Sequence, residues 1–147
     1  MSAVGVRTVS AQDVIAVRWL ILRAGFPRES AVFDGDDAPA TIHLGGFVED
    51  RLVGVASIYA APMPDQPGDA RQLRGMATLP AVRGAGVGRA LLAACEDAAR
   101  ASGAALIWCN ARVSAAEFYR RLGWEISGAE FDIPTVGPHF RMSRSLV

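Results

Sequence analysis

The sequence predicts a mixed α/β domain in which helices flank a central sheet. Strand-like and helix-like segments alternate along the chain, as they do in α/β folds. Residues 104–110 are apolar on both faces, which is typical of a central strand. A glycine-rich segment, residues 84–88, joins a strand-like run to a helix-like run. The predicted order is roughly β-α-β-β-β-α-β-α-β-β, and we expect residues 1–147 to form a single domain.

Composition and charge exclude several classes of protein. The 147 residues are 51% hydrophobic and 20% charged, so we expect a folded rather than a disordered chain. Fifteen basic residues balance fifteen acidic ones, and we therefore expect neither nucleic acid nor a membrane as a partner. The absence of a signal-peptide pattern and of any run of ~18 apolar residues predicts a cytoplasmic protein. Cys95 and Cys109 have neither zinc-ligand spacing nor a disulfide framework, so no metal is expected.

The first forty residues predict one strand, one helix and a loop. Residues 4–9 are predicted to form a short strand. Ser10 is the predicted N-cap of a helix, with Asp13 as a variant of the capping box, and apolar residues at helical spacing extend this helix to about Arg23. Residues 25–40 are polar and contain two prolines, which predicts a loop with at most a short helix.

Three strands are predicted in the next forty residues. Residues 41–50 and 52–61 have the spacing of a hairpin around a charged turn. Residues 62–70 contain three prolines and are predicted to form a loop. Residues 71–79 form the next predicted strand, which Pro80 ends.

Two helices are predicted in the second half of the chain. Apolar residues at helical spacing predict a helix over residues 87–101, and Gly103 is expected to end it. After the central strand, Ser114 and Glu117 have the spacing of a full capping box, which predicts a short helix that Gly123 ends.

Two strands, residues 124–128 and 139–147, are predicted at the end of the chain. Because side chains alternate along a strand, the last one has two faces. We expect one face to pack on the core, formed by Phe140, Met142 and Leu146. The opposite face is formed by His139, Arg141 and Ser143.

The glycines of residues 84–88 need a reason, because glycine costs a helix roughly 1 kcal/mol relative to alanine. A strand followed by glycines and a helix start can bind phosphate, since free N–H groups point outward and no Cβ blocks the ligand. Arg83 and Arg89 flank the segment and could add charge-assisted hydrogen bonds. No lysine follows Gly88 as in a P-loop, and the dinucleotide fingerprint fails at its third glycine. A phosphate-bearing ligand is therefore predicted, with a tight turn that binds nothing as the alternative.

The same segment resembles a known signature. Arg83, Gly86 and Gly88 fill the R/Q-x-x-G-x-G/A pattern of the GCN5-related N-acetyltransferases, the GNAT superfamily. Pro80 before the segment, the sequence NARVSAAEFYRRLGW after it and the strand order are similar to that family too, so the resemblance covers nearly the whole chain. The sequences LIWCNAR and GPHFRM resemble the ElaA-like branch.

The resemblance implies a coenzyme A site where two parallel strands, 71–79 and 104–110, splay apart. Backbone N–H groups of the loop would bind the pyrophosphate of acetyl-CoA, namely those of Arg83, Gly84, Ala85, Gly86, Val87, Gly88 and Arg89. The pantetheine arm would pair with the first strand at Met76 and Thr78, and an amide near Met76 or Ala77 would polarise the thioester carbonyl. Its far side would be bordered by Asn110, Ala115 and Phe118. No metal takes part.

The implied chemistry is direct attack of a neutral primary amine on the thioester. Tyr119 occupies the family position for the acid that protonates the leaving thiolate, with a packed core tyrosine as the alternative. Gln72, Arg74 and Thr78 stand on the strand where many relatives carry a glutamate base. His139 is a candidate base, although a lone histidine is more often structural.

Several points stay open at this stage. The same fold could bind coenzyme A without transfer, as a sensor, and an unrelated nucleotide-binding domain is a third reading. His43 is a second, less supported candidate for the base, and Cys109 is expected to be simply buried. The acceptor is expected to be a small-molecule or peptide amine, its pocket shaped by the loops 25–41 and 61–70, and a homodimer is left open. We expect five loop acids to be solvated, although they could favour a cationic acceptor: Asp34, Asp36, Asp37, Asp65 and Asp69.

Overall fold

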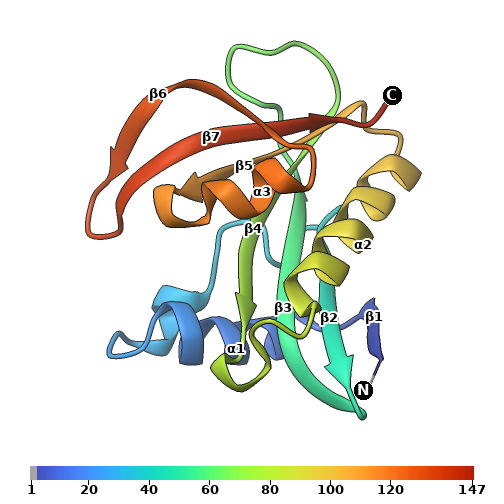
Figure 1. Cartoon of the computed structure of the whole chain (residues 1–147), viewed down its shortest axis with the longest axis vertical. Helices are drawn as coiled ribbons and strands as arrows, with labels where there is room; N and C mark the ends of the chain where they lie inside the picture. The colour runs from blue at the N-terminus through green and yellow to red at the C-terminus, as the bar shows by residue number, and fades with distance from the viewer. Residues whose placement is uncertain (1–2) are drawn as a thin grey trace. The chain divides into compact units, whose positions relative to one another are not determined.

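The helices and strands follow the predicted order in a computed structural model that describes residues 3–147 (Figure 1). The strands are β1 (Val4–Thr8), β2 (Ile42–Val48), β3 (Arg51–Ala60), β4 (Ala70–Thr78), β5 (Leu106–Arg112), β6 (Glu125–Ile133) and β7 (Gly137–Ser145). The α-helices are α1 (Ala11–Leu22), α2 (Val87–Ala101) and α3 (Ala116–Arg121), and the 3-10 helices are η1 (Arg28–Ala31), η2 (Pro80–Val82) and η3 (Val113–Ala115). The hydrogen-bonded strand order is β1-β2-β3-β4-β5-β7-β6, which confirms the predicted fold class. Within residues 3–147, no helix is long and apolar enough to cross a membrane.

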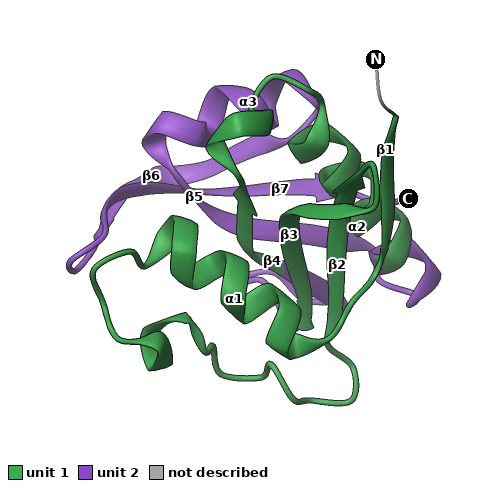
Figure 2. Ribbon diagram, turned by 90° about the horizontal axis from the view of Figure 1, so that it is seen from below, with its two compact units in different colours: residues 1–60, 73–98 green, residues 61–72, 99–147 purple. Residues whose placement is uncertain are grey.

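Residue contacts divide the chain into two units, which are coloured separately in Figure 2. Unit 1 takes in residues 1–60 and 73–98, and unit 2 takes in residues 61–72 and 99–147. Strand β4 and helix α2 therefore each contribute residues to both units. The single-domain organisation stays a prediction, and each unit is described by itself.

Helix α1 packs on one face of the β2–β3 hairpin in unit 1. It begins with the predicted capping box: Ser10 Oγ accepts the Asp13 N–H at 3.1 Å, and the Asp13 carboxylate accepts the Ser10 N–H at 3.3 Å. A cap of this kind contributes about 1 kcal/mol to helix stability. Behind the cap, Val14 and Val17 are buried against Val55 of β3. The sequence pattern of α1 was therefore sufficient to predict its start and its apolar contact.

Helix α2 lies on the opposite face of that hairpin, where two glycines make room for it. Gly54 directly precedes Val55, and consecutive strand residues point to opposite faces. Gly46 and Gly54 are paired across the hairpin, and a Cβ would lie 3.1 Å from Val87 Cγ1 at Gly46 and 2.8 Å from it at Gly54. Val87 and Leu91 are buried in this recess. The glycine pair thus seats the first turn of α2 against the sheet.

Unit 2 is built around β5. This strand runs parallel to β4 over Leu106–Trp108 and antiparallel to β7 along its whole length, so it is the inner strand that its apolar sequence predicts. In the part of the chain that the structure describes, β6 pairs only with β7 and is an edge strand. The indole N–H of Trp108 donates to the Ala61 carbonyl at 3.0 Å, and the ring packs on Met63 and Ala70. These contacts fix the loop 61–70 to β5.

The predicted capping box at Ser114 is wrong. The chain passes through the 3-10 turn η3 before α3 begins at Ala116, so the N-cap position falls on Ala115, which has no side-chain cap bond. Ser114 lies in the 3-10 turn instead, one residue before the position where a cap acts. Gly123, with φ of 94°, follows the C-cap residue Leu122 and ends the helix as predicted.

The predicted faces of β7 are partly wrong. Met142 and Leu146 are buried as expected, but Phe140 is only half-buried. His139, expected on the face away from the core, is only 4% exposed. The reason is the length of β6, which reaches Ile133 rather than ending near residue 128 and places the Phe131 ring 6.1 Å from the His139 ring. Both faces of β7 are therefore covered at this end.

Candidate active site

The glycine loop between η2 and α2 leaves bare backbone exposed in unit 1. Gly84 and Gly86 have φ of 85° and 86°, and a Cβ at either position would meet nothing within 4 Å. The Gly86 carbonyl accepts the Ala90 N–H at 3.0 Å, so the helix begins immediately after this glycine. The next N–H groups, those of Val87 to Arg89, belong to the first turn and have no partner within the helix. Two of the predicted donors are already used, because the Arg83 N–H donates to the Pro80 carbonyl at 3.3 Å and the Ala85 N–H to the Val82 carbonyl at 3.1 Å. The free donors that an anion needs are therefore those of the first turn, beside the open space at Gly84 and Gly86.

Arg83 and Arg89 add positive charge at this loop. Both side chains are exposed, and neither forms an ion pair with any residue that the structure describes. Together with the positive end of the helix dipole, two free guanidinium groups favour a negatively charged ligand.

The predicted residues of β4 differ in the direction of their side chains. Ala77 is 4% exposed and belongs to the apolar cluster that packs on α1. Thr78 points to the other face, because its Cγ2 would lie 3.1 Å from a Cβ at Gly54. Met76 is half-buried. Their backbone groups, rather than one shared set of side chains, are what this segment could offer to a ligand.

Tyr119 lies in an aromatic and sulfur environment within unit 2. Its ring centroid is 5.2 Å from the rings of both Phe118 and Trp124, and the residue is 7% exposed. Its hydroxyl is hydrogen-bonded to the thiol of Cys109, whose pKa burial raises to about 12. The expected burial of Cys109 is confirmed, and its thiol stays protonated at neutral pH. A phenol held in this way is oriented by packing on one side and by a sulfur partner on the other.

Asn110 carries an unsatisfied polar atom. Its Oδ1 is buried and has no hydrogen-bond partner among the described residues, although Asn110 itself is only half-buried. A buried acceptor without a donor is costly, so this oxygen is available to accept a hydrogen bond from a ligand. Ala115 and Phe118, the other residues predicted to border the ligand in this unit, are half-buried on η3 and α3.

His139 and Arg141 belong to one cluster on a single face of β5, β7 and β6, which we call the Arg141 cluster. Asn110 pairs directly with Arg141, and His139 pairs directly with Phe131 of β6. Residues that pair across strands point to the same face. The Arg141 guanidinium lies 5.8 Å from the Trp108 ring and 5.6 Å from the Phe131 ring. The cluster therefore consists of Trp108, Asn110, Phe131, His139 and Arg141, and the exposed Arg112, which pairs with His139 across the strands, lies at its edge on the same face.

The tautomer of His139 follows from its hydrogen bond. Its Nδ1 lies 2.7 Å from the Gly137 carbonyl oxygen, which can only accept. In the neutral ring Nδ1 must therefore carry the proton, and Nε2 has a free lone pair. An imidazole fixed in this way can accept a proton at Nε2.

The predicted acid and the predicted base lie on opposite faces of β5. Tyr119 bonds to Cys109, whereas His139 shares a face with Asn110, the next residue along the strand. Successive strand residues point to opposite faces. The two groups could therefore serve two different atoms of a reaction, and they are not placed to share one proton.

A buried polar network that the sequence reasoning missed anchors the loop 28–38 in unit 1. Arg18 is fully buried and donates to both carboxylate oxygens of Asp36, at 2.8 and 3.0 Å, and to the hydroxyls of Ser57 and Tyr59. Burial, with the Asp36 hydrogen bond next, raises the pKa of Tyr59 to about 12. His43 uses both ring nitrogens, on Ser57 Oγ and the Asp36 carbonyl, so it has no nitrogen left for catalysis. The signal was present in the sequence: Arg18 sits within the apolar stripe of α1, at helical spacing from Val14.

Two of the five loop acids form ion pairs within the protein. Asp36 is buried in the network just described rather than solvated, and Asp69 pairs with Arg71 at 2.6 Å. Asp34, Asp37 and Asp65 are exposed, as expected. Of the strand positions noted above, Arg74 stacks on the rings of Phe33 and Tyr59 in place of a carboxylate base.

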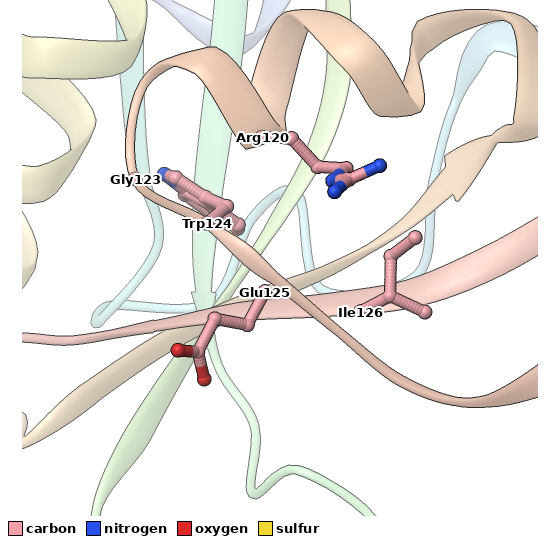
Figure 3. Close-up of a pocket in the computed structure, with 5 residues that line it drawn as sticks. All are labelled: Arg120, Gly123, Trp124, Glu125 and Ile126. Carbon is pink, nitrogen blue, oxygen red and sulfur yellow. The ribbon is translucent and has the colours of Figure 1, made fainter.

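Unit 2 has an open hollow of about 610 Å³ that none of the predicted site residues lines, although Trp124 in its wall contacts the Tyr119 ring (Figure 3). It is lined by Arg120, Gly123, Trp124, Glu125 and Ile126. In Figure 3 the Arg120 and Glu125 side chains point in different directions and do not converge on one point. Within residues 3–147, no group of three or more His, Cys, Asp or Glu side chains is arranged to hold a metal. The hollow thus offers no catalytic arrangement.

The strand order and the bare glycine loop at the start of α2 are those of an N-acetyltransferase fold, and comparisons with known proteins agree. The model of the acetyltransferase (GNAT) family matches residues 12–124, and the chain belongs to this family of enzymes. YitI of Bacillus subtilis, an uncharacterized N-acetyltransferase, is 36% identical over 142 residues, which cover 96% of this chain and 95% of that protein.

Two solved structures share the fold at lower identity. An aminoglycoside 6'-N-acetyltransferase complexed with coenzyme A has a TM-score of 0.76 and 15% identity, with 97% of each chain covered. ElaA of Escherichia coli has a TM-score of 0.75 and 16% identity, with 97% of this chain and 99% of that chain covered. ElaA is thus a structural neighbour, and likeness at this identity concerns the fold.

Proposed function

We propose that the protein transfers the acetyl group of acetyl-CoA to a primary amine by direct attack on the thioester. The observation that carries the proposal is the loop at the start of α2, where Gly84 and Gly86 leave backbone and space open and two arginines are unpaired. The pyrophosphate of coenzyme A supplies the negative charge that such a helix start favours. The aminoglycoside acetyltransferase with the similar fold binds coenzyme A, which supports the same assignment here.

Unit 2, taken by itself, offers groups that would suit a pantetheine arm. The orphaned Asn110 Oδ1 is an acceptor that an amide N–H of the pantetheine arm would satisfy. Met76 to Thr78 would bind the arm through their backbone, as predicted from the sequence.

The proton transfers can be assigned to two residues. In the proposed reaction the amine nitrogen forms a bond to the thioester carbon, the C–S bond breaks, and one proton must leave nitrogen while sulfur gains one. His139 Nε2 would take the amine proton, directly or through water, because Nδ1–H is committed to the Gly137 carbonyl. Tyr119 would donate to the leaving sulfur, for which its hydroxyl would have to turn away from the Cys109 sulfur that accepts its hydrogen bond in the free protein. In the tetrahedral intermediate the amine nitrogen and the sulfur are bonded to the same carbon, so two groups on opposite faces of β5 can serve both atoms only if one of them acts through water.

The test is a pair of glycine substitutions at the two ends of one helix. Gly86→Asp places a carboxylate where the pyrophosphate would lie, whereas Gly103→Asp makes the same change at the far end of α2, at a nearly equal φ of 88° and with equally open space. In calorimetric titrations with coenzyme A, Gly86→Asp should weaken binding at least tenfold, about 1.4 kcal/mol, and Gly103→Asp should leave it unchanged. If the two variants bind coenzyme A with equal affinity, the glycine loop does not bind the pyrophosphate. Release of free thiol from acetyl-CoA in a panel of amines then distinguishes transfer from binding alone.

A further inference from the structure

Arg141 is a cation without a counterion in the middle of the Arg141 cluster. In the described part of the chain it forms no ion pair, and its Nε is buried with no hydrogen-bond partner. Glu125, which its register with Ser143 places on the same face, does not pair with it. Arg71 also has a buried Nε without a partner, but its guanidinium pairs with Asp69, and that of Arg144 donates to the Leu122 carbonyl. A half-buried guanidinium with an orphaned N–H is costly unless a ligand completes it.

Two aromatic rings position the Arg141 guanidinium. Its carbon lies 5.8 Å from the Trp108 ring and 5.6 Å from the Phe131 ring, on two different strands. Stacking on aromatic rings restricts the guanidinium without using its N–H groups, which leaves the planar fork free. This fork matches the two oxygens of a carboxylate in a bidentate pair. The guanidinium therefore selects a ligand that carries a carboxylate, a selectivity that the aromatic rings alone would not provide.

We propose that the acceptor amine carries a carboxylate, which Arg141 binds while His139 receives the amine proton. This inference rests on the function proposed above. His139 and Arg141 are alternate residues of β7 on one face, and such residues are about 7 Å apart along a strand. An amino acid has its amine and its carboxylate two or three bonds apart. With one hydrogen bond of about 2.8 Å at each end, it spans a comparable distance. The substrate class is therefore amino acids rather than polyamines or other cationic amines.

The experiment compares acceptors that differ only in the acid group. Acetyl transfer is measured for free amino acids, for their carboxamides and for a dipeptide, in which the amine and the terminal carboxylate are farther apart. The variants are Arg141→Gln, Arg141→Lys and the control Arg121→Gln, whose side chain is 77% exposed on α3. Coenzyme A affinity is measured for each variant by calorimetry. The Arg141 Nε–H resonance is followed by NMR as an N-acetyl amino acid, the product, is added.

We expect the wild type to have a kcat/KM at least about tenfold higher for a preferred amino acid than for its amide, the size of one charge-assisted pair. In Arg141→Gln the KM for the amino acid should rise until the preference is lost, and the kinetics with the amide should change little. Arg141→Lys should retain part of the preference. Arg121→Gln should behave as wild type, and the product should shift the Nε–H resonance. A dipeptide that reacts as well as the amino acid would count against the inference, because its amine and its carboxylate are farther apart than the spacing of His139 and Arg141 allows.

Three further results would overturn the inference. One is equal turnover of acids and amides. Another is turnover of amides alone. The third is an Arg141→Gln variant that has a lower melting temperature and loses activity equally toward all acceptors, with no effect of the product on the wild-type resonance, which would make Arg141 structural. Failure of the proposed function is distinguishable from all three, because the wild type would then acetylate no amine of the panel, whether or not it binds coenzyme A.

Discussion

Replacing Asp36 by asparagine should expose how much of the stability of unit 1 depends on one buried ion pair. Arg18 is fully buried, and the Asp36 carboxylate is the charge that neutralises it through two hydrogen bonds of 2.8 and 3.0 Å. Asparagine keeps the shape and removes the charge, so the guanidinium is left buried without a counterion. Breaking such a pair costs about 3–5 kcal/mol. At about 2–4 °C per kcal/mol for a chain of this size, the melting temperature should fall by roughly 6–20 °C.

The pH dependence gives a second measure of the same pair. Burial alone would raise the pKa of Asp36, but the hydrogen bonds from Arg18, Tyr59 and the Phe33 N–H outweigh it and hold the pKa below 3.8. A carboxylate with a lowered folded pKa stabilises the protein above its unfolded pKa, and this contribution is lost as the pH falls through the folded value. The stability difference between wild type and Asp36→Asn should therefore be constant above about pH 5 and shrink as the pH falls below 3.8.

The assay is urea unfolding followed by far-UV circular dichroism, with a thermal scan at the same pH values. Asp37→Asn is the control, because Asp37 is the next residue and is exposed, so it should change stability by no more than about 0.5 kcal/mol. An Asp36→Asn variant within 1 kcal/mol of the wild type would refute the reasoning, since it would mean that the Arg18 charge is compensated elsewhere.

Further outcomes concern the proposed reaction and the thiols. Tyr119→Phe should lower kcat at least about tenfold with little change in the KM for acetyl-CoA, whereas a purely structural tyrosine would lower the melting temperature and leave turnover intact. Coenzyme A binding should weaken as salt rises, because exposed charges are screened within a Debye length of ~8–10 Å. In titrations at several salt concentrations, Arg83→Ala and Arg89→Ala should each make coenzyme A binding less sensitive to salt. Binding by the wild type that does not change with salt would contradict a contact between these arginines and phosphate. Cys95 and Cys109, both with a pKa of about 12 through burial, should resist alkylation at pH 8 until the protein is unfolded in urea, and fast labelling of the native protein would show an accessible thiol.

Elements with a strong local pattern could be predicted from the sequence. The capping box of Ser10 and the doubly apolar strand β5 depend on nearby residues, and both formed as expected. The start of α3 could not be predicted, because the spacing of Ser114 and Glu117 does not reveal that a 3-10 turn precedes the helix. Local chemistry allows both starts, and the tertiary structure decides between them.

The site was predicted unevenly for the same reason. The glycine loop is encoded by consecutive residues, so its backbone could be anticipated. The burial of His139 depends on Phe131, a residue of another strand whose length the sequence did not indicate. Asp36 was expected to be solvated because it lies in a polar loop, yet it is paired with an arginine 18 residues earlier in the chain. Pairings of this kind have no periodicity, although a charged residue within an apolar helical stripe, such as Arg18, is a useful warning.

The paired glycines Gly46 and Gly54 affect the glycine loop at the start of α2 indirectly, because both lie against Val87 in the first turn of that helix. A methyl group at position 54 would press on Val87 at 2.8 Å and lift the first turn of the helix, together with the N–H groups that follow Gly86. Random mutagenesis screened for weak coenzyme A binding should therefore return substitutions at Gly46 and Gly54, some forty and thirty residues away in sequence from the loop. An inventory of ligand-contacting residues would leave both positions out. During evolution, the size of the side chain at these two positions is constrained by the ligand as well as by the fold.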